Sequence, residues 1–279
     1  ISLSNQAKVS ILTCGTGPES YAMYGHTGIR IQDISQQIDV VYNYGAFDFS
    51  TPNFIGRFVK GDLQYFVTNG SYIDFYYNYQ AENREIIEQE LALSPTQINQ
   101  LFQQLNTSVY SDERFYTYKF IDRNCTTMVV DKINTTLGKE YIKSSSSNQS
   151  YREILYPYMS EFYMKLGIQL IFGTKVDEPA TRLFLPYEFK KAISQTKVNE
   201  KAIEKSNETI LVAQKTNIPF NWLNSIYSLI GALLLLVILG KKWIKTTYFT
   251  IAGLLGMFFS LVGLYSLHEE ILWNYNILL

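Results

Sequence analysis

The sequence has 279 residues and a formal net charge of −1, with 24 Lys and Arg residues against 25 Asp and Glu residues. This balance excludes the strongly basic surface that nucleic-acid binding needs, so we expect no nucleic-acid partner. With two histidines, two cysteines and neither a Cys-x-x-Cys nor a phosphate-binding glycine motif, we expect no metal ion and no other cofactor. About 215 residues precede the first long apolar run, which is enough for one sizeable soluble core.

Strand and helix patterns mix along those residues, which predicts an α+β fold. In chain order we expect strand Lys8–Thr13, a short helix at Glu19–Tyr24, a hairpin of Thr27–Gln32 and Asp39–Tyr44, helix Phe54–Leu63, strand Gln64–Asn69 and helix Tyr72–Gln80. Arg84–Leu93 mixes strand-like and helical features, which leaves both open and favours a strand. After it we expect a helix from Ser94 to about Leu105, strand Phe115–Ile121, helix Asn124–Leu137, a flexible loop at Ser144–Ser147, a helical stretch at Gln149–Leu166 and a last helix at Pro186–Ser194. The helix after Ser94 has a clear start signal, because a serine cap precedes proline and a glutamine follows.

The predicted hairpin brings a histidine and an amide together. We expect Gln32 to pair with Asp39 across the two strands. In that register Asn43 is the diagonal neighbour of His26, and both side chains lie on the same face. The amide of Asn43 would then hold one nitrogen of the imidazole.

His26 and Cys125 stand in settings that suit thiol chemistry. Gly25 can break the chain just before His26, which begins an alternating, strand-like run. Cys125 begins a helical pattern, and the first turn of a helix favours the thiolate over the thiol. A thiolate beside an imidazole is an activated nucleophile, so the pair predicts a cysteine-dependent enzyme.

Cys14 provides the main alternatives to this interpretation. In an oxidising compartment Cys14 and Cys125 can form a structural disulfide. Cys14 can also be the nucleophile itself, since it lies in a Cys-Gly-Thr-Gly turn. Taken alone, Cys125 is also compatible with a small buried residue and His26 with a structural histidine.

Two apolar runs near the C-terminus, Trp222–Leu239 and Tyr248–Leu267, are each long enough to cross a bilayer and contain no charged residue. Lys241, Lys242 and Lys245 lie between them, and short positive loops are retained in the cytoplasm. We therefore expect a transmembrane helical hairpin in a bacterial inner membrane, with the N-terminal domain in the periplasm.

These runs set the predicted domain boundaries. Residues 1–196 would form a periplasmic catalytic domain, 197–220 a polar tether, 221–240 the first transmembrane helix, 241–247 a cytoplasmic loop, 248–267 the second transmembrane helix, and 268–279 a periplasmic tail or the start of a further segment. His268 would lie at the periplasmic interface. There it either binds a lipid headgroup or a substrate amine, or is a solvated helix end.

The chemistry-bearing residues follow a recognisable order: a histidine on one strand, a polar residue on the next strand, and Asn-Cys at a helix start. This order resembles circularly permuted papain-like proteins related to NlpC/P60 peptidases and lecithin:retinol acyltransferases. More closely, the chain resembles the periplasmic domain of the Bacteroidota lipoprotein N-acyltransferase family, Lnb. The blocks that carry this resemblance are Ile11-Leu12-Thr13-Cys14-Gly15, Glu19-Ser20-Tyr21, Tyr24-Gly25-His26, Tyr42-Asn43-Tyr44-Gly45, the segment from Phe47 to Phe54, Asn124-Cys125-Thr126-Thr127 and, at lower density, Phe184-Leu185-Pro186.

The resemblance implies a circularly permuted papain-like fold and a ping-pong acyl transfer. Cys125, activated by His26 as general base, would take an acyl chain from a membrane phospholipid to form a thioester. The free α-amine of a diacylglyceryl-cysteine lipoprotein would then attack that thioester. The backbone N–H of Cys125 would help to stabilise the oxyanion. The expected partners are thus a phospholipid donor, a diacylated lipoprotein acceptor and the membrane.

The resemblance also supplies supporting candidates for the site: Glu19, Arg30, Asn43, Tyr44, Asp48 and Asn124. Asn43 or Asp48 would orient His26, and Glu19 would face the site from the preceding helix. Each is also compatible with ordinary turn or sheet chemistry. We further expect a groove lined by Tyr, Phe and Leu side chains from the catalytic pair toward the membrane.

Two other functions fit the same residues. A membrane-anchored cysteine peptidase or amidase acting on peptidoglycan would use Cys125 and His26 with water as the acceptor. A lipoprotein-binding module with a structural disulfide would need no catalysis.

Overall fold

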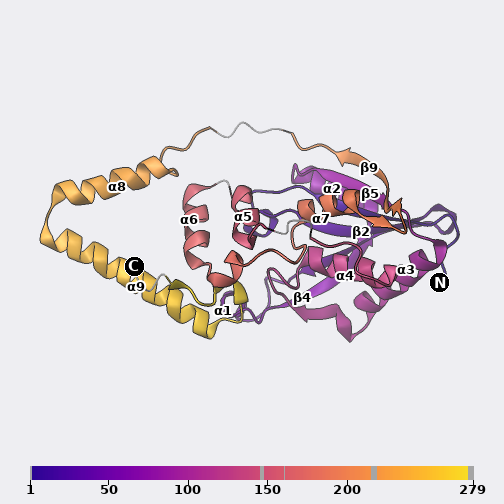
Figure 1. Cartoon of the computed structure of the whole chain (residues 1–279), viewed down its shortest axis with the longest axis horizontal. Helices are drawn as coiled ribbons and strands as arrows, with labels where there is room; N and C mark the ends of the chain where they lie inside the picture. The colour runs from indigo at the N-terminus through magenta and orange to yellow at the C-terminus, as the bar shows by residue number, and fades with distance from the viewer. Residues whose placement is uncertain (1, 145–147, 160, 215–218, 276–279) are drawn as a thin grey trace. The chain divides into compact units, whose positions relative to one another are not determined.

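The computed structural model describes residues 2–144, 148–159, 161–214 and 219–275 (Figure 1). The expectations for 145–147, 160, 215–218 and 276–279 lie outside these residues. The chain divides into two compact units. The first comprises Ile1–Phe58, Asp62–Ser147 and Ala180–Lys215, and the second comprises Val59–Gly61, Asn148–Pro179 and Thr216–Leu279.

The first unit is built on a seven-stranded antiparallel sheet. Its strand order is β6-β4-β3-β2-β1-β5-β9. The bounds are β1 Lys8–Cys14, β2 His26–Asp33, β3 Ile38–Ala46, β4 Gln64–Ser71, β5 Ile86–Leu91, β6 Phe115–Thr117 and β9 Glu204–Leu211. A separate two-stranded ribbon pairs β7 (Lys197–Val198) with β8 (Lys201–Ala202). The mixed α+β class predicted from the sequence is therefore confirmed.

Helices cover both faces of this sheet because successive strand residues point to opposite sides. On one face Ile11, Ile29 and Ile31 belong to a core that includes α3 (Pro95–Tyr110), α4 (Cys125–Leu137) and α7 (Pro186–Gln195). On the other face Leu12 and Cys14 pack with Phe75 of α2 (Tyr72–Ala81). Helix α1 (Phe54–Lys60) spans the division between the units, since its last two residues belong to the second.

The capping box at Ser94 is confirmed. The hydroxyl of Ser94 accepts a hydrogen bond from the N–H of Gln97, and the Gln97 side chain accepts one from the N–H of Ser94. The helix runs on to Tyr110, beyond the expected end near Leu105, because Val109 still packs into the core. The strand expected at Phe115–Ile121 ends at Thr117.

Residues 197–220, expected to be a polar tether, instead contribute strands as far as Leu211. Strand β9 pairs with β5 and forms an edge of the sheet. Residues Glu204 to Thr209 of this strand are all polar, which suits an edge strand whose backbone pairs on one side only. Ile203 is buried just before β9, and Leu211 packs against the core on the α2 face.

The second unit contains mostly helices. The single helical stretch expected at Gln149–Leu166 is wrong: α5 (Tyr151–Leu155) is followed by the short 3₁₀ helix Tyr156–Tyr158 and then by α6 (Phe162–Ile171). Pro157 lies at the break, and proline cannot donate the backbone hydrogen bond that would continue α5. Arg152 ties these helices together through Asp177 and Gln169.

Among the described residues, one helix is long and apolar enough to cross a membrane. It is α9 (Lys242–Tyr265), with a mean hydropathy of 1.7 in its most apolar window. The other apolar helix of the expected hairpin, α8 (Ile226–Leu239), has 14 residues, and a perpendicular crossing needs about 20. Lys242 and Lys245, expected in a loop, lie in the first turns of α9.

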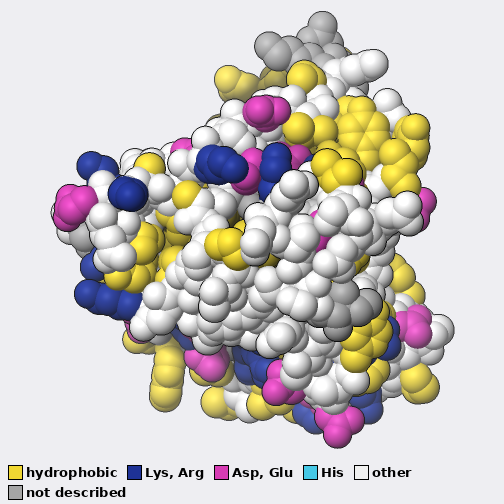
Figure 2. Space-filling model, turned by 90° about the vertical axis from the view of Figure 1, so that its right-hand side faces the viewer, with side chains coloured by type: hydrophobic (Ala, Val, Ile, Leu, Met, Phe, Trp, Pro, Cys, Tyr) yellow, Lys and Arg dark blue, Asp and Glu magenta, His cyan; other side chains and the backbone are white. Residues whose placement is uncertain are grey.

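The surface carries charges of both signs. On the face drawn in Figure 2, Lys and Arg side chains lie interspersed with Asp and Glu side chains. This agrees with the net charge of −1.

Candidate active site

His26 begins β2 directly after a glycine turn. Gly25 has a φ of +80°, and a Cβ placed on it would lie 2.6 Å from the carbonyl oxygen of Cys14. Only glycine is comfortable in this conformation at this distance. The turn sets His26 opposite Cys14 in the β1–β2 ladder, at one end of the sheet.

Asn43 holds the imidazole of His26. The predicted hairpin register is confirmed, since Gln32 pairs with Asp39. The Oδ1 atom of Asn43 lies 3.1 Å from Nε2 of His26. Gly28, which pairs with Asn43, leaves room for the amide, because a Cβ there would lie 3.3 Å from that Oδ1. With Oδ1 as acceptor, Nε2 carries hydrogen and Nδ1 is the ring nitrogen left for another partner.

Cys125 is the first residue of α4, and Asn124 is the N-cap that fixes this helix start. The Oδ1 atom of Asn124 accepts hydrogen bonds from the backbone N–H groups of Thr126 and Thr127, at 2.9 and 3.0 Å. Its Nδ2 donates to the carbonyl oxygens of Phe120 and Phe184. All four polar contacts are made by one buried amide, so Asn124 links the helix start to two neighbouring loops.

The Asn124→Ala substitution should therefore destabilise the domain. It removes the cap and leaves two carbonyl groups without their donor, which together lower the free energy of unfolding by about 2 to 3 kcal/mol. Thermal unfolding of the full chain in detergent measures the change. Ser71→Ala removes the more exposed cap of α2 and is the matched control, with a smaller expected loss. Equal losses in the two variants would contradict this account of Asn124.

The thiol of Cys125 and the imidazole of His26 form a coupled pair. Burial raises the pKa of Cys125, but the charge of His26 and hydrogen bonds from His26, from the Thr27 N–H and from the Thr126 hydroxyl outweigh it and lower that pKa. Burial lowers the pKa of His26, but the charge of Cys125 and hydrogen bonds to Cys125 and Asn43 raise it overall. Both shifts favour a thiolate–imidazolium pair, the reactive form of a cysteine nucleophile.

Two more groups close to the sulfur were not predicted from the sequence. The Cβ position of Gly45, whose φ is +96°, lies 3.6 Å from Cβ of Cys125, so a side chain there would crowd the nucleophile. Tyr116 is buried, and its hydroxyl makes no hydrogen bond of ordinary geometry within the described part of the chain. Burial and then the charge of Cys125 raise the pKa of Tyr116, and a hydrogen bond with the backbone of Gly45 lowers it less, so the hydroxyl stays protonated.

The comparisons with known proteins bear on this geometry. A family model described as the Lnb N-terminal periplasmic domain matches residues 2–156. The chain belongs to this family. The match includes His26, Asn43 and Cys125, and together with helix α9 it fits a membrane protein that carries a periplasmic domain.

The remaining comparisons add little to the Lnb assignment. Among solved structures, the crystal structure of the type VI secretion system effector TseH is 15% identical to this chain. The similarity covers 48% of this chain and 78% of that chain, with a TM-score of 0.33. The search of curated proteins finds no match.

Three of the predicted supporting residues of the Lnb domain make structural contacts. Arg30 forms ion pairs with Asp39 and Glu88, and its guanidinium lies 3.3 Å from the centre of the Tyr72 ring. Tyr44 is buried in the core that includes α3 and α4. These contacts stabilise the sheet and the packing of the helices on it.

The third of these residues is Asp48, which accepts a hydrogen bond from the N–H of Ser50 at 2.8 Å. That bond lowers the pKa of Asp48 and holds the turn after β3. Of the two candidates for orienting His26, the structure gives the contact to Asn43. Glu19 is an exposed residue before the short 3₁₀ helix Ser20–Ala22, and its carbonyl accepts from the N–H of Ala22.

Arg84 is a neighbour of the site that no sequence pattern indicated. This buried guanidinium donates from Nε to the carbonyl of Gly15 at 2.8 Å and pairs with Glu82. It lies 4.6 Å from the centre of the Tyr79 ring. Its charge acts to lower the pKa of His26, against the larger effect of Cys125. Through its hydrogen bond to Gly15, Arg84 holds the loop that follows β1 next to the His26–Cys125 pair.

The disulfide expected as an alternative is wrong, because Cys14 and Cys125 are both free thiols. Cys14 is fully buried, and burial raises its pKa to about 12. A thiol in this setting is a poor nucleophile. The structure therefore favours Cys125 over Cys14 as the reactive residue of the Lnb domain.

Selective alkylation checks this difference. At pH 7 about 10⁻⁵ of Cys14 is thiolate, given its pKa of about 12. The lowered pKa of Cys125 keeps its thiolate fraction far higher. Iodoacetamide added to the full chain should therefore modify Cys125 and leave Cys14 unmodified, as read by peptide mass mapping. Equal modification of the two under native conditions would contradict the assignment.

His268 belongs to the second unit, where its ring lies against Gly61. The nearest ring atom, Cδ2, lies 3.1 Å from the Cβ position of that glycine. The φ of +79° at Gly61 and this close approach both require glycine. The expected position of His268 on the same side of the membrane as Cys125 stays a prediction.

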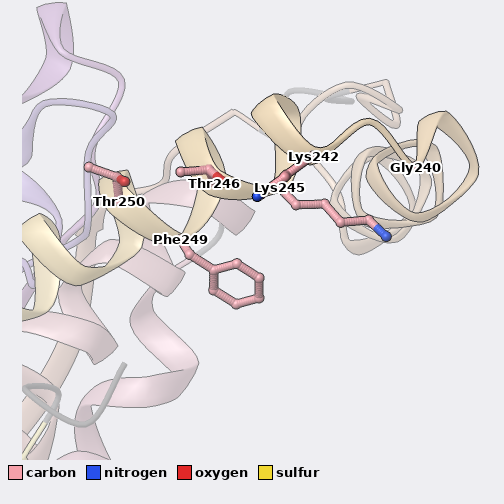
Figure 3. Close-up of a pocket in the computed structure, with 6 residues that line it drawn as sticks. All are labelled: Gly240, Lys242, Lys245, Thr246, Phe249 and Thr250. Carbon is pink, nitrogen blue, oxygen red and sulfur yellow. The ribbon is translucent and has the colours of Figure 1, made fainter.

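The described residues contain no group of His, Cys, Asp and Glu side chains that could hold a metal ion. A surface pocket in the second unit is lined by Lys242, Lys245, Thr246, Phe249 and Thr250 with Gly240 (Figure 3). The pocket lies at the end of α8 and the start of α9, and neither His26 nor Cys125 lines it. The expected apolar groove from Cys125 toward the membrane stays a prediction.

The Asn43→Ala substitution tests the orienting role of the amide. Without the bond to Nε2 the imidazole is free to turn away from the sulfur, so the rate of the acyl transfer that the family resemblance implies should fall about 10- to 100-fold. Asn43→Gln, which keeps the amide but lengthens the side chain, should recover little of the rate. Steady-state rates with unfolding temperatures as a folding control measure the effect. A rate unchanged in Asn43→Ala would show that His26 needs no orienting partner.

Proposed function

We propose that this chain is a lipoprotein N-acyltransferase. In this proposal residues 1–196 form a circularly permuted papain-like catalytic domain with no cofactor, and Cys125 is the nucleophile. The observation that carries the proposal is the Cys125–His26–Asn43 arrangement within an Lnb domain, because the shifted pKa values of the pair suit a thiolate nucleophile and an imidazolium acid.

The first half-reaction loads the enzyme. The thiolate of Cys125 attacks an ester carbonyl of a membrane phospholipid, so a C–S bond forms and the ester C–O bond breaks. The His26 imidazolium gives its proton to the departing alkoxide oxygen, which becomes the free hydroxyl of the lysophospholipid. The acyl group is then held as a thioester, which keeps its transfer potential.

The second half-reaction unloads the acyl group onto a lipoprotein. The α-amine of a diacylglyceryl-cysteine attacks the thioester carbonyl, a C–N bond forms and the C–S bond breaks. Neutral His26 takes the proton from the amine, and the thiolate of Cys125 is regenerated beside the imidazolium. In both halves the N–H of Cys125 at the start of α4 and the O–H of Tyr116 are donors for the oxyanion.

Membrane attachment supports this chemistry. We infer that residues 221–240 and 248–267 form a transmembrane hairpin in the inner membrane, with Lys241, Lys242 and Lys245 on the cytoplasmic side. Both substrates are lipids in that membrane, so a tethered domain meets them at high effective concentration.

The proposal is tested with the purified full chain, phosphatidylethanolamine vesicles and a synthetic diacylglyceryl-cysteine peptide. The expected product is the peptide heavier by one fatty acyl chain, with lysophospholipid formed in equal amount. The main alternative uses the same pair with water as acceptor, as a peptidase or amidase acting on peptidoglycan. Cleavage of peptidoglycan without any acylated peptide would support that alternative and overturn the transferase.

A further inference from the structure

A cluster of aromatic side chains, three of them exposed and two partly buried, lies next to the His26–Cys125 pair. We call Tyr21, Phe47, Phe49, Phe54 and Phe58 the aromatic surface. Their ring centroids form a continuous series: Tyr21–Phe47 at 6.2 Å, Phe47–Phe49 at 4.9 Å, Phe49–Phe54 at 5.0 Å and Phe54–Phe58 at 6.5 Å. Phe49 is 68% exposed and Phe58 is 50% exposed. Single exposed apolar residues are ordinary, but a connected group of this kind marks an interaction site.

The aromatic surface begins close to the nucleophile. Phe47 follows Gly45 by two positions at the end of β3, and the Cβ position of Gly45 lies 3.6 Å from Cβ of Cys125. The ring of Phe47 also packs on Tyr65, which stacks on Tyr118 at 4.4 Å. Phe47, Phe54 and Cys125 pack against one core. An apolar ligand lying on the aromatic surface would therefore have one end close to the sulfur.

The chemistry of the neighbouring residues suits a phospholipid. Helix α1 carries the exposed, basic Arg57 between Phe54 and Phe58. An aromatic face with a basic residue beside it is typical of segments that lie in the bilayer interface, where rings enter the acyl region and the cation meets phosphate.

Hydrogen bonds at the end of α1 also indicate a position at the bilayer interface. Within the second unit, the carbonyl of Val59 accepts a hydrogen bond from the hydroxyl of Ser266 at 2.9 Å, and that of Lys60 accepts one from the N–H of Leu267 at 2.6 Å. Ser266 and Leu267 directly follow α9, the candidate membrane span. A helix that crosses the bilayer ends at its interface, so the last residues of α1 lie at that level too.

We propose that the aromatic surface inserts into the leaflet on the periplasmic side and binds phospholipid acyl chains there. The role of this binding in turnover rests on the proposed function, in which a phospholipid bound here would present its donor ester directly to Cys125. The insertion itself depends only on the exposed rings and the basic residue beside them. A second copy of this chain is the occupant that the experiment must exclude.

Photo-cross-linking identifies what touches the aromatic surface. The full chain carries p-benzoylphenylalanine in place of Phe49 or Phe58 and is reconstituted in vesicles of phosphatidylethanolamine and phosphatidylglycerol. The matched control is the same residue in place of Tyr110, which is 73% exposed at the end of α3. Illumination should add one phospholipid mass at positions 49 and 58 and leave position 110 unmodified. Equal lipid labelling at all three positions, or cross-links between two protein chains, would overturn the proposal.

A double substitution measures what the surface does for turnover. Phe49→Asp with Phe58→Asp removes two inserted rings, each worth about tenfold in membrane binding. The ratio of Cys125 acylation from vesicle phospholipid to acylation from a water-soluble short-chain ester should fall about a hundredfold. The Tyr110→Asp control should keep the wild-type ratio. An unchanged ratio in the double variant would overturn the proposal.

The two proposals fail in different ways. If the wild type forms no acyl adduct from either donor but still cross-links to lipid at positions 49 and 58, the acyltransferase is wrong and the membrane surface stands. If acylation proceeds normally but the lipid cross-links are absent, the surface is wrong and the acyltransferase stands.

Discussion

The Cys125→Ser variant is expected to lose acyl transfer, by about 10⁴-fold or more. A serine hydroxyl is not ionised near neutral pH, so it cannot form the ion pair with His26 that lowers the pKa of the cysteine. The substitution replaces the sulfur by a smaller, less polarizable oxygen atom and adds no bulk. The hydrogen bonds of Asn124 to Thr126 and Thr127 remain. Transfer is measured as the gain of one acyl chain by a diacylglyceryl-cysteine peptide.

Cys14→Ala is the matched control for this substitution. Cys14 is the other cysteine of the chain and lies opposite His26 in the sheet, but it is fully buried and remains a thiol. The variant should keep most of the transfer rate and lose some stability, since it leaves a small cavity on the α2 face. If Cys14→Ala abolished transfer and Cys125→Ser did not, Cys14 would be the nucleophile.

Replacing His26 by Gln should lower the rate about 10²- to 10⁴-fold. Gln keeps hydrogen-bonding groups in reach of Asn43, but it neither accepts nor releases a proton at physiological pH. It also removes the positive charge that lowers the pKa of Cys125, so burial then dominates and that pKa rises. The rate of iodoacetamide labelling of Cys125 against pH should therefore shift to higher pH in the variant.

The pH dependence of acyl transfer by the wild type follows from the pKa shifts of the same two residues. The reactive ion pair forms as pH rises through the lowered pKa of Cys125 and is lost as pH rises through the raised pKa of His26. Transfer should therefore show a bell-shaped profile whose two limbs belong to the pair as a whole. A labelling profile for His26→Gln that matches the wild type would contradict the coupling between the two residues.

Much of the site was predictable because its parts are local. The alternation in Thr27–Gln32 and Asp39–Tyr44 fixed the hairpin register, and the register alone brought Asn43 to His26. The Asn-Cys start of α4 was readable in the same way, since an N-cap residue acts on the next few backbone groups.

Other parts depended on contacts that no local pattern encodes. The polar composition of Glu204–Leu211 fits both a solvated linker and an edge strand, and only pairing with β5 decides between them. Tyr116 and Arg84 reach the site across the fold from segments that look like ordinary strand and loop. Asp48 lies in a matching block, and the hydrogen bond that the structure gives its carboxylate is to the N–H of Ser50 in its own turn.

The most direct measurement of the central claim is the intact mass of the full chain after incubation with phospholipid and no acceptor. The account predicts a gain of one fatty acyl chain that maps to the peptide containing Cys125, is released by neutral hydroxylamine and passes to the lipopeptide amine when that acceptor is added. A chain that turns over phospholipid or lipopeptide while Cys125 remains unmodified, or an acyl group found on any other residue, would contradict it.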